Sequence, residues 1–183
     1  HQAAWVAMHT PGVASERTFM LHFVKSPDMG VTSSPTVAEV AAKVSTRVLT
    51  AAEMLGMAQQ VFDDTLDYLK QRVQFSQVLA TFQALQHRMA DLFADLAQMR
   101  SAVEGGLQAI DSGFGVAHAA TVAKAEANRV LHLISNQGIQ LHGGIGMTDE
   151  YDVGFYLKRA RVLESSWGSS SYLRDRFARL SKY

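Results

Sequence analysis

The chain has 183 residues, 48% of them apolar, which is enough for one hydrophobic core and favours one domain with an appended segment. Seventeen basic and seventeen acidic residues cancel. No block of like charge stands out, so neither a nucleic acid nor an anionic membrane is expected as a partner. The absence of cysteine excludes disulfides and thiol catalysis, and a cytoplasmic location is expected. No apolar run approaches the ~20 residues that a membrane-spanning helix needs.

Residues 1–35 differ in character from the rest of the chain. They contain all of its prolines, which are Pro11, Pro27 and Pro35. Because proline breaks helix interiors, a domain boundary is predicted near residue 35. We expect an N-terminal arm or the remnant of a preceding β domain, with short strands at residues 3–8 and 19–24. A disordered tail is the alternative, since one or two short strands bury little surface.

From residue 36 onward the apolar side chains recur with helical spacing. Four helical stretches are predicted, at about 36–73, 79–112, 115–141 and, interrupted at 165–169, 153–180. The third stretch is rich in alanine, whose small side chain lets neighbouring helices approach closely. Long helices joined by short polar loops predict an all-α fold, an antiparallel four-helix bundle over residues 36–183.

A run of glycines ends the third helical stretch. Gly143, Gly144 and Gly146 occupy three of four consecutive positions. Each glycine costs a helix roughly 1 kcal/mol, so the run predicts a tight turn. Such a turn either stops the helix, the commoner use, or brings bare backbone N–H groups close to a phosphate or another chain.

Three motifs around the predicted helix ends occur in a fixed order. The first combines Tyr68, Arg72 and Phe75; the second runs from Phe82-Gln83 to Ala90-Asp91; the third joins Gln140 to the glycines and is followed by Glu150-Tyr151 and Arg159-Ala160. With these motifs the chain resembles, over about residues 45–180, the C-terminal helical domain of the acyl-CoA dehydrogenases. Those proteins are FAD-dependent enzymes that desaturate acyl-CoA thioesters.

The resemblance implies a set of flavin contacts. Its members are Arg72, Phe75 and Gln83, which would touch the FAD held by a neighbouring subunit, and Gln140, Gly143 and Gly144, which would reach its adenylate end. The chemistry agrees, because a guanidinium pairs with pyrophosphate in a bidentate manner, and an amide offers both a donor and an acceptor. For Arg72 the alternative role is a helix C-terminal cap.

The resemblance also implies a catalytic carboxylate, which this chain lacks at both positions that the family uses. Those positions hold Trp167 and Thr46, the residue before Arg47. Neither side chain accepts a proton at neutral pH. Two carboxylates nearby in sequence, Glu53 and Glu164, are the remaining candidates for the base. A buried ion pair or subunit contact for Glu53 and a solvated helix position for Glu164 are the structural alternatives.

No spacing of histidines and carboxylates suggests a metal site, although His142, beside the glycines, is a candidate for a hydrogen bond to phosphate. Because the chain keeps the flavin contacts but lacks the base, it resembles the small, non-catalytic subunits of heteromeric acyl-CoA dehydrogenases. Such assemblies act on steroid side chains and dicarboxylic acids in bacteria. The implied partners are a second copy or a catalytic subunit, an acyl-CoA substrate and an electron-transfer flavoprotein.

Family members also carry an N-terminal helical domain and a middle β domain. We therefore expect this chain to be a fragment or a shortened paralogue that is not a competent dehydrogenase on its own. Two functions compete at this point. If the chain forms one half of a composite flavin site, Arg72, Gln83 and Gln140 should converge on one surface. If the chain is instead a helical oligomerisation module that no longer binds flavin, it should have an apolar face without converging polar groups.

Overall fold

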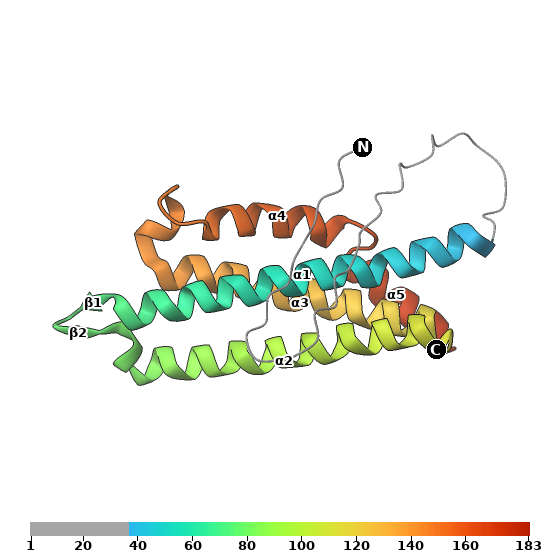
Figure 1. The fold of residues 1–183 in the computed structure, drawn as a ribbon, viewed down its shortest axis with the longest axis horizontal. Helices are drawn as coiled ribbons and strands as arrows, with labels where there is room; N and C mark the ends of the chain where they lie inside the picture. The colour runs from blue at the N-terminus through green and yellow to red at the C-terminus, as the bar shows by residue number, and fades with distance from the viewer. Residues whose placement is uncertain (1–36) are drawn as a thin grey trace.

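The computed structural model describes residues 37–183, and the arm expected at residues 1–35 lies outside this part. Its main elements are the helices α1 (Val37–Gln71), α2 (Gln83–Ser112), α3 (Val116–His142), α4 (Val153–Ser165) and α5 (Ser170–Leu180). Figure 1 shows α1, α2 and α3 lying side by side along one axis, with α4 on the opposite side from α2. The predicted all-α, four-helix architecture is confirmed, with α4 and α5 as the two halves of the fourth helix.

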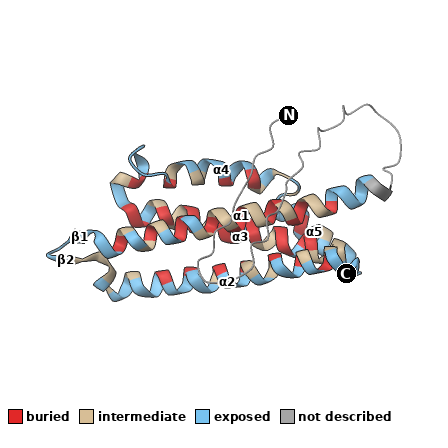
Figure 2. Cartoon of the chain, viewed as in Figure 1, coloured by how far each residue is buried: buried red, intermediate tan, exposed pale blue. Residues whose placement is uncertain are grey.

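The core lies between the three long helices, where the buried residues in Figure 2 face inward. Met54, Met99 and Leu131 are completely buried members of it. Along α3 the contact surface is made of small side chains, and Ala123 and Ala127 have no exposed area. Gly138 continues this surface, since a Cβ atom there would lie 2.8 Å from a methyl group of Val61 on α1. Small residues on α3 therefore allow α1 to approach closely, as the alanine-rich sequence indicates.

The first joint of the bundle is a β-hairpin that the sequence does not predict. The first helix stops at Gln71, and strands β1 (Val73–Gln74) and β2 (Gln77–Val78) pair antiparallel before a short 3-10 turn, η1 (Leu79–Thr81). The two turn residues, Phe75 and Ser76, both have positive φ, at 53° and 65°. Two-residue hairpins with a type I′ turn require positive φ at both positions and usually obtain it with Asn-Gly or Asp-Gly. Phe-Ser gives no such signal, which explains why the helix was predicted to extend to residue 73.

The other joints follow the sequence signals. Gly113 ends α2 in the left-handed conformation at φ 69°. The break predicted at residues 165–169 is confirmed: α4 ends at Ser165, Trp167 has φ 60°, and the Ser169 side chain accepts the Tyr172 amide at the start of α5. Serine is a favoured N-cap residue because its oxygen satisfies an otherwise unpaired helix N–H group.

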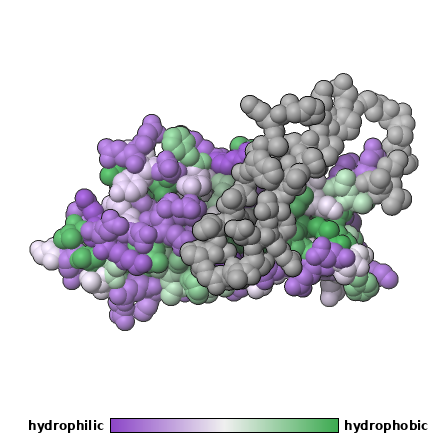
Figure 3. All heavy atoms as spheres, viewed as in Figure 1, coloured by the Kyte–Doolittle hydropathy of each residue, from purple (hydrophilic) through white to green (hydrophobic). Residues whose placement is uncertain are grey.

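The outward faces of the helices are mainly polar. Figure 3 shows hydrophilic residues over much of the visible surface of the described part, with smaller hydrophobic areas between them. Within residues 37–183, none of the helices combines the length and the apolarity needed to cross a membrane.

Candidate functional site

The hairpin and the glycine turn lie at the same end of the bundle (Figure 1). This follows from the topology, because α1 and α3 run in the same direction and the two segments directly follow their C-termini. The glycine turn is a 3-10 helix, η2 (Gly143–Met147). A hydrogen bond of 3.3 Å from the Tyr68 hydroxyl to the His142 carbonyl joins the end of α1 to the end of α3.

All six positions that the resemblance assigns to FAD are exposed at this end. They are Arg72, Phe75, Gln83, Gln140, Gly143 and Gly144. Within residues 39–183, the side chains of the arginine and the two glutamines form no hydrogen bond or ion pair. Three polar side chains with unused hydrogen-bonding capacity therefore face outward at one end of the molecule.

Phe75 is the most prominent apolar residue at this end. It lies at the tip of the hairpin with 83% of its surface exposed, and its ring meets Phe82 edge-on at a centroid distance of 6.1 Å. A bulky residue at positive φ costs free energy, so the hairpin presents this ring against local preference. Strain combined with exposure is typical of a residue that is retained for contact rather than for folding.

The three glycines of the turn have different roles. Gly143 ends α3 at φ 66°, so it is a helix stop. A Cβ atom on Gly144 would meet nothing within 4 Å, which leaves its backbone open to a ligand. A Cβ atom on Gly146 would lie 2.9 Å from the Ile139 carbonyl oxygen, so this glycine lets the turn fold back on α3. The turn is thus a helix stop, as the commoner use of such a run predicts, and its backbone at Gly144 is accessible.

His142 lies beneath the turn rather than at its surface. It is 3% exposed, its Nδ1 lies 2.8 Å from the Gly138 carbonyl oxygen, and its ring stacks on Tyr68 at 4.4 Å. The Nε2 atom is buried without a hydrogen-bond partner in this arrangement. The expectation that His142 reaches a phosphate is therefore not met, and the ring supports the turn from inside.

The structure brings together the two positions where the family places its base. Arg47, next to Thr46, donates a hydrogen bond of 2.9 Å from Nε to the carbonyl oxygen of Trp167. The Thr46 hydroxyl is used within its own helix, since it donates to the Ala42 carbonyl at 2.8 Å. No carboxylate replaces the missing base at these two positions, and the Trp167 side chain is about half exposed.

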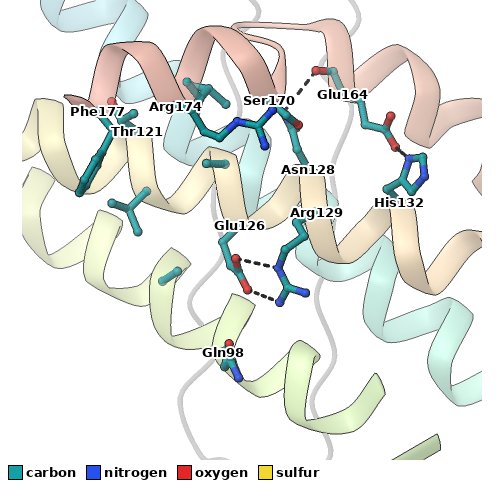
Figure 4. A pocket seen from close by; sticks show the side chains of 14 residues that line it. Gln98, Thr121, Glu126, Asn128, Arg129, His132, Glu164, Ser170, Arg174 and Phe177 are labelled. Carbon is teal, nitrogen blue, oxygen red and sulfur yellow. Dashed lines mark hydrogen bonds and ion pairs between the residues drawn. The ribbon is translucent and has the colours of Figure 1, made fainter. Parts of the chain in front are cut away.

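Glu53 and Glu164, the two remaining candidates for the catalytic base, both lie in ion pairs. The Glu53 carboxylate accepts from Arg159 at 2.7 Å. Glu164 accepts from Arg161 at 3.1 Å and lies 3.1 Å from Nδ1 of His132. Figure 4 shows Glu164 beside His132 at a groove of about 710 Å³, which is lined by residues of α2, α3, α4 and α5. Neither carboxylate is a free base in this arrangement.

A buried polar pair on α3 holds the loop between α4 and α5. Lys124 is completely buried and donates to the Leu163 carbonyl at 2.9 Å and to the Asn128 side-chain oxygen. Asn128 in turn donates to the Gly168 carbonyl at 3.1 Å. Burial lowers the pKa of Lys124 to about 8, opposed by the charge of Glu164 and assisted by that of Arg47. This buried pair was not predicted from the sequence. The signal that could have indicated it is a lysine and an asparagine four residues apart within an alanine-rich helix.

Metal ligation finds no support in this part of the chain. Across residues 37–183, no group of three or more His, Cys, Asp or Glu side chains is arranged to hold a metal ion.

Known proteins with similar sequences and structures agree with this architecture. The family model described as "Acyl-CoA dehydrogenase, C-terminal domain" matches residues 40–181. The acyl-CoA dehydrogenase IpdE2 of Mycobacterium tuberculosis is 41% identical over 135 residues, which are 72% of this chain and 39% of IpdE2. The Tcur3481–Tcur3483 steroid ACAD, seen in a variant structure, shares 31% identity with a TM-score of 0.76, covering 80% of this chain and 41% of that one.

The fold alone is shared with the ChsE4–ChsE5 complex of Mycobacterium tuberculosis, at 22% identity and a TM-score of 0.76 over 81% of this chain and 41% of that one. This chain therefore spans about two fifths of the length of the relatives that it matches.

Proposed function

Since the chain belongs to the acyl-CoA dehydrogenase family, whose C-terminal domain it contains, we propose that it supplies one side of a composite FAD site in a subunit without its own catalytic base. The observation that carries this proposal is the joint exposure of Arg72, Gln83 and Gln140, unpaired within the described residues, at one end of the bundle. A bundle that served only for assembly would have no need to keep three such side chains together.

The residues at this end fit a flavin dinucleotide. The family is FAD-dependent, and the cofactor supplies the hydride acceptor when bound. In our proposal Arg72 pairs with the pyrophosphate, Phe75 packs on an aromatic face, and Gln83 and Gln140 supply amide hydrogen bonds. The open backbone at Gly144 admits the adenylate end. These residues bind and orient the cofactor, and none of them moves a proton.

The catalytic base in this proposal comes from a partner subunit. The two family base positions hold Thr46 and Trp167, and Glu53 and Glu164 are held in ion pairs. Family members oligomerise, and the structures similar to this chain include the ChsE4–ChsE5 and Tcur3481–Tcur3483 complexes. We therefore propose a hetero-oligomer in which a catalytic acyl-CoA dehydrogenase subunit binds the acyl-CoA and carries the glutamate. The Tcur3481–Tcur3483 steroid ACAD supports a steroid-derived acyl group as the substrate class.

Flavin absorbance and particle mass test this proposal. The chain is purified alone and after co-expression with a full-length catalytic acyl-CoA dehydrogenase subunit from the same operon. A yellow mixed complex that loses its flavin on Arg72→Ala supports the composite site. The matched control is Arg174→Ala, which removes an exposed arginine on α5. Flavin retention in Arg72→Ala, or no mixed complex, contradicts it.

A helical oligomerisation module is the second candidate, favoured by large apolar side chains on the outer face of α4. Phe155 and Val162 are 53% and 54% exposed there, two turns apart. A colourless, self-associated chain in both preparations would leave this function only.

A further inference from the structure

A cluster of cationic side chains lies beside the half of α1 that is farther from the hairpin. At its centre is Arg47, which is 8% exposed. Its Nε donates to the Trp167 carbonyl at 2.9 Å, its Nη2 lies 3.4 Å from the Tyr172 hydroxyl, and its guanidinium carbon lies 5.8 Å from the Tyr172 ring centroid. All of these partners are neutral, so a buried positive charge is held without a counter-ion among the described residues.

Arg176 brings a second guanidinium to the same place. It follows Tyr172 by one turn of α5, and its Nε atom is buried without a hydrogen-bond partner among the described residues. The pKa of Arg47 is lowered, first by burial and second by the charge of Arg176, so the two cations lie close enough to repel each other. Within residues 39–183 no carboxylate forms an ion pair with either arginine.

A cavity opens on α5 beside Tyr172 and Arg176. It has a volume of about 280 Å³ and is lined by Tyr172, Arg176, Arg179 and Leu180. Arg179 is already paired with Asp175, which leaves Arg176 as the unpaired cation of the lining. A water molecule takes up roughly 30 Å³ in the liquid, so the cavity has room for a small polyatomic anion with its solvent.

We infer that Arg47, Tyr172 and Arg176 form a binding site for an oxyanion, a carboxylate or a phosphate group. A buried charge is costly unless it is paired, and two adjacent guanidinium groups raise this cost, so a hydrogen-bonded anion beside them would offset it. The geometry supplies matching donors. The Arg176 Nε–H lacks an acceptor, and the Tyr172 oxygen accepts from Arg47, which leaves the Tyr172 proton free to be donated.

This inference goes beyond the flavin proposal and uses none of its residues. The site adjoins Trp167 at the position where the family places a base, but its charge is positive. It therefore holds a negatively charged group instead of removing a proton. Loss of flavin binding would leave this inference intact, and failure to bind an anion would leave the flavin proposal intact.

The test measures the melting temperature and the binding isotherm of the full 183-residue chain with propionate and with inorganic phosphate. Sodium chloride at the same ionic strength controls for screening. We expect a saturable single-site response to propionate or to phosphate that chloride does not give. A response to propionate alone identifies a carboxylate as the ligand group, and a response to phosphate alone identifies a phosphate.

Two variants assign the response to this cluster. Arg176→Gln should weaken binding by about tenfold or more, because a charge-assisted hydrogen bond is lost. Its melting temperature without ligand should match or exceed that of the wild type, since the repulsion with Arg47 is removed. Arg174→Gln, on the same helix but outside the cavity, should bind as the wild type does.

Tyr172→Phe serves as the second variant if Arg176→Gln does not fold, and it should also weaken binding. Equal responses to all three salts, or unchanged binding in Arg176→Gln, overturn the inference.

Discussion

The Arg47 guanidinium donates a hydrogen bond of 2.9 Å to the main-chain carbonyl of Trp167, a residue 120 positions later in the chain. Trp167 has φ 60°, an unfavourable value for a residue with a bulky side chain. The carbonyl that accepts from Arg47 therefore belongs to a strained peptide unit, and the bond helps to hold the loop between α4 and α5 in this shape.

Arg47→Ala should destabilise the protein by about 1–3 kcal/mol, because it removes this bond and leaves a part-buried carbonyl unpaired. Urea unfolding measures the loss, and amide hydrogen exchange at Ser166 and Leu173, which are hydrogen-bonded at the two ends of this loop, should accelerate more than exchange in α2. Arg174 is exposed and forms no ion pair among the described residues, so Arg174→Ala should change stability by less than about 0.5 kcal/mol. Equal effects of the two variants would contradict this role for Arg47.

Lys124 should make stability rise with pH in the alkaline range. Its pKa falls from 10.5 to about 8 in the folded protein, so between these values the unfolded chain binds a proton that the folded chain does not. The free energy of unfolding should then increase from pH 8 to 10.5, by at most about 3 kcal/mol. Below pH 8 this contribution is absent, because the buried amine is charged in the folded protein too.

The matched variant for this pH dependence is Lys124→Met, which keeps an unbranched apolar side chain out to Cε and removes the amine. The difference in unfolding free energy between wild type and variant, measured with urea at four pH values from 7.5 to 10.5, isolates Lys124 from the other titrating groups. Parallel curves for the two proteins would show that Lys124 keeps its ordinary pKa.

Two glycines of the same turn should respond differently to alanine. Gly146→Ala places a methyl group 2.9 Å from the Ile139 carbonyl oxygen, so the turn must shift, at a cost of about 1–3 kcal/mol. Gly144→Ala meets no atom within 4 Å and should change stability by less than about 0.5 kcal/mol. Thermal unfolding separates the two variants. In the proposed mixed complex, Gly144→Ala should reduce flavin retention while leaving the fold intact.

The hairpin tip should show a conflict between stability and function. Asparagine tolerates the left-handed conformation better than phenylalanine, so Phe75→Asn should raise the stability of the isolated chain by about 0.5–1 kcal/mol. The same variant should lose flavin from the mixed complex. Ser76→Gly relaxes the neighbouring turn position and keeps the ring, so it should retain flavin. Loss of flavin in both variants would indicate that hairpin shape, rather than the Phe75 ring, governs binding.

The helical part of this architecture could be predicted from sequence because its signals are local. Apolar spacing identified the long helices, and Ser169 with Gly168 marked the break before α5. The hairpin escaped prediction because Phe75-Ser76 adopts a conformation that the chain context imposes against residue preference.

Contacts between distant residues could not be predicted either. The Arg47–Trp167 bond and the Lys124–Leu163 bond join residues 120 and 39 positions apart, and no local pattern encodes such a distance. For Glu53 the sequence offered a buried ion pair as one alternative, but its partner, Arg159, lies 106 positions away and was not predicted, and the pair lies at the surface. Which polar groups are free and which are satisfied by a partner becomes visible only once the helices are packed.

The straight course of α1 also sets a length scale for the whole molecule. From Arg47 to Gln71 the helix advances 24 residues, which corresponds to about 36 Å at 1.5 Å per residue. A small anion bound at Arg47 cannot touch a nucleotide bound at the hairpin. Substitutions at the two ends should therefore have additive free energies, and each end can be saturated or removed while the other is measured.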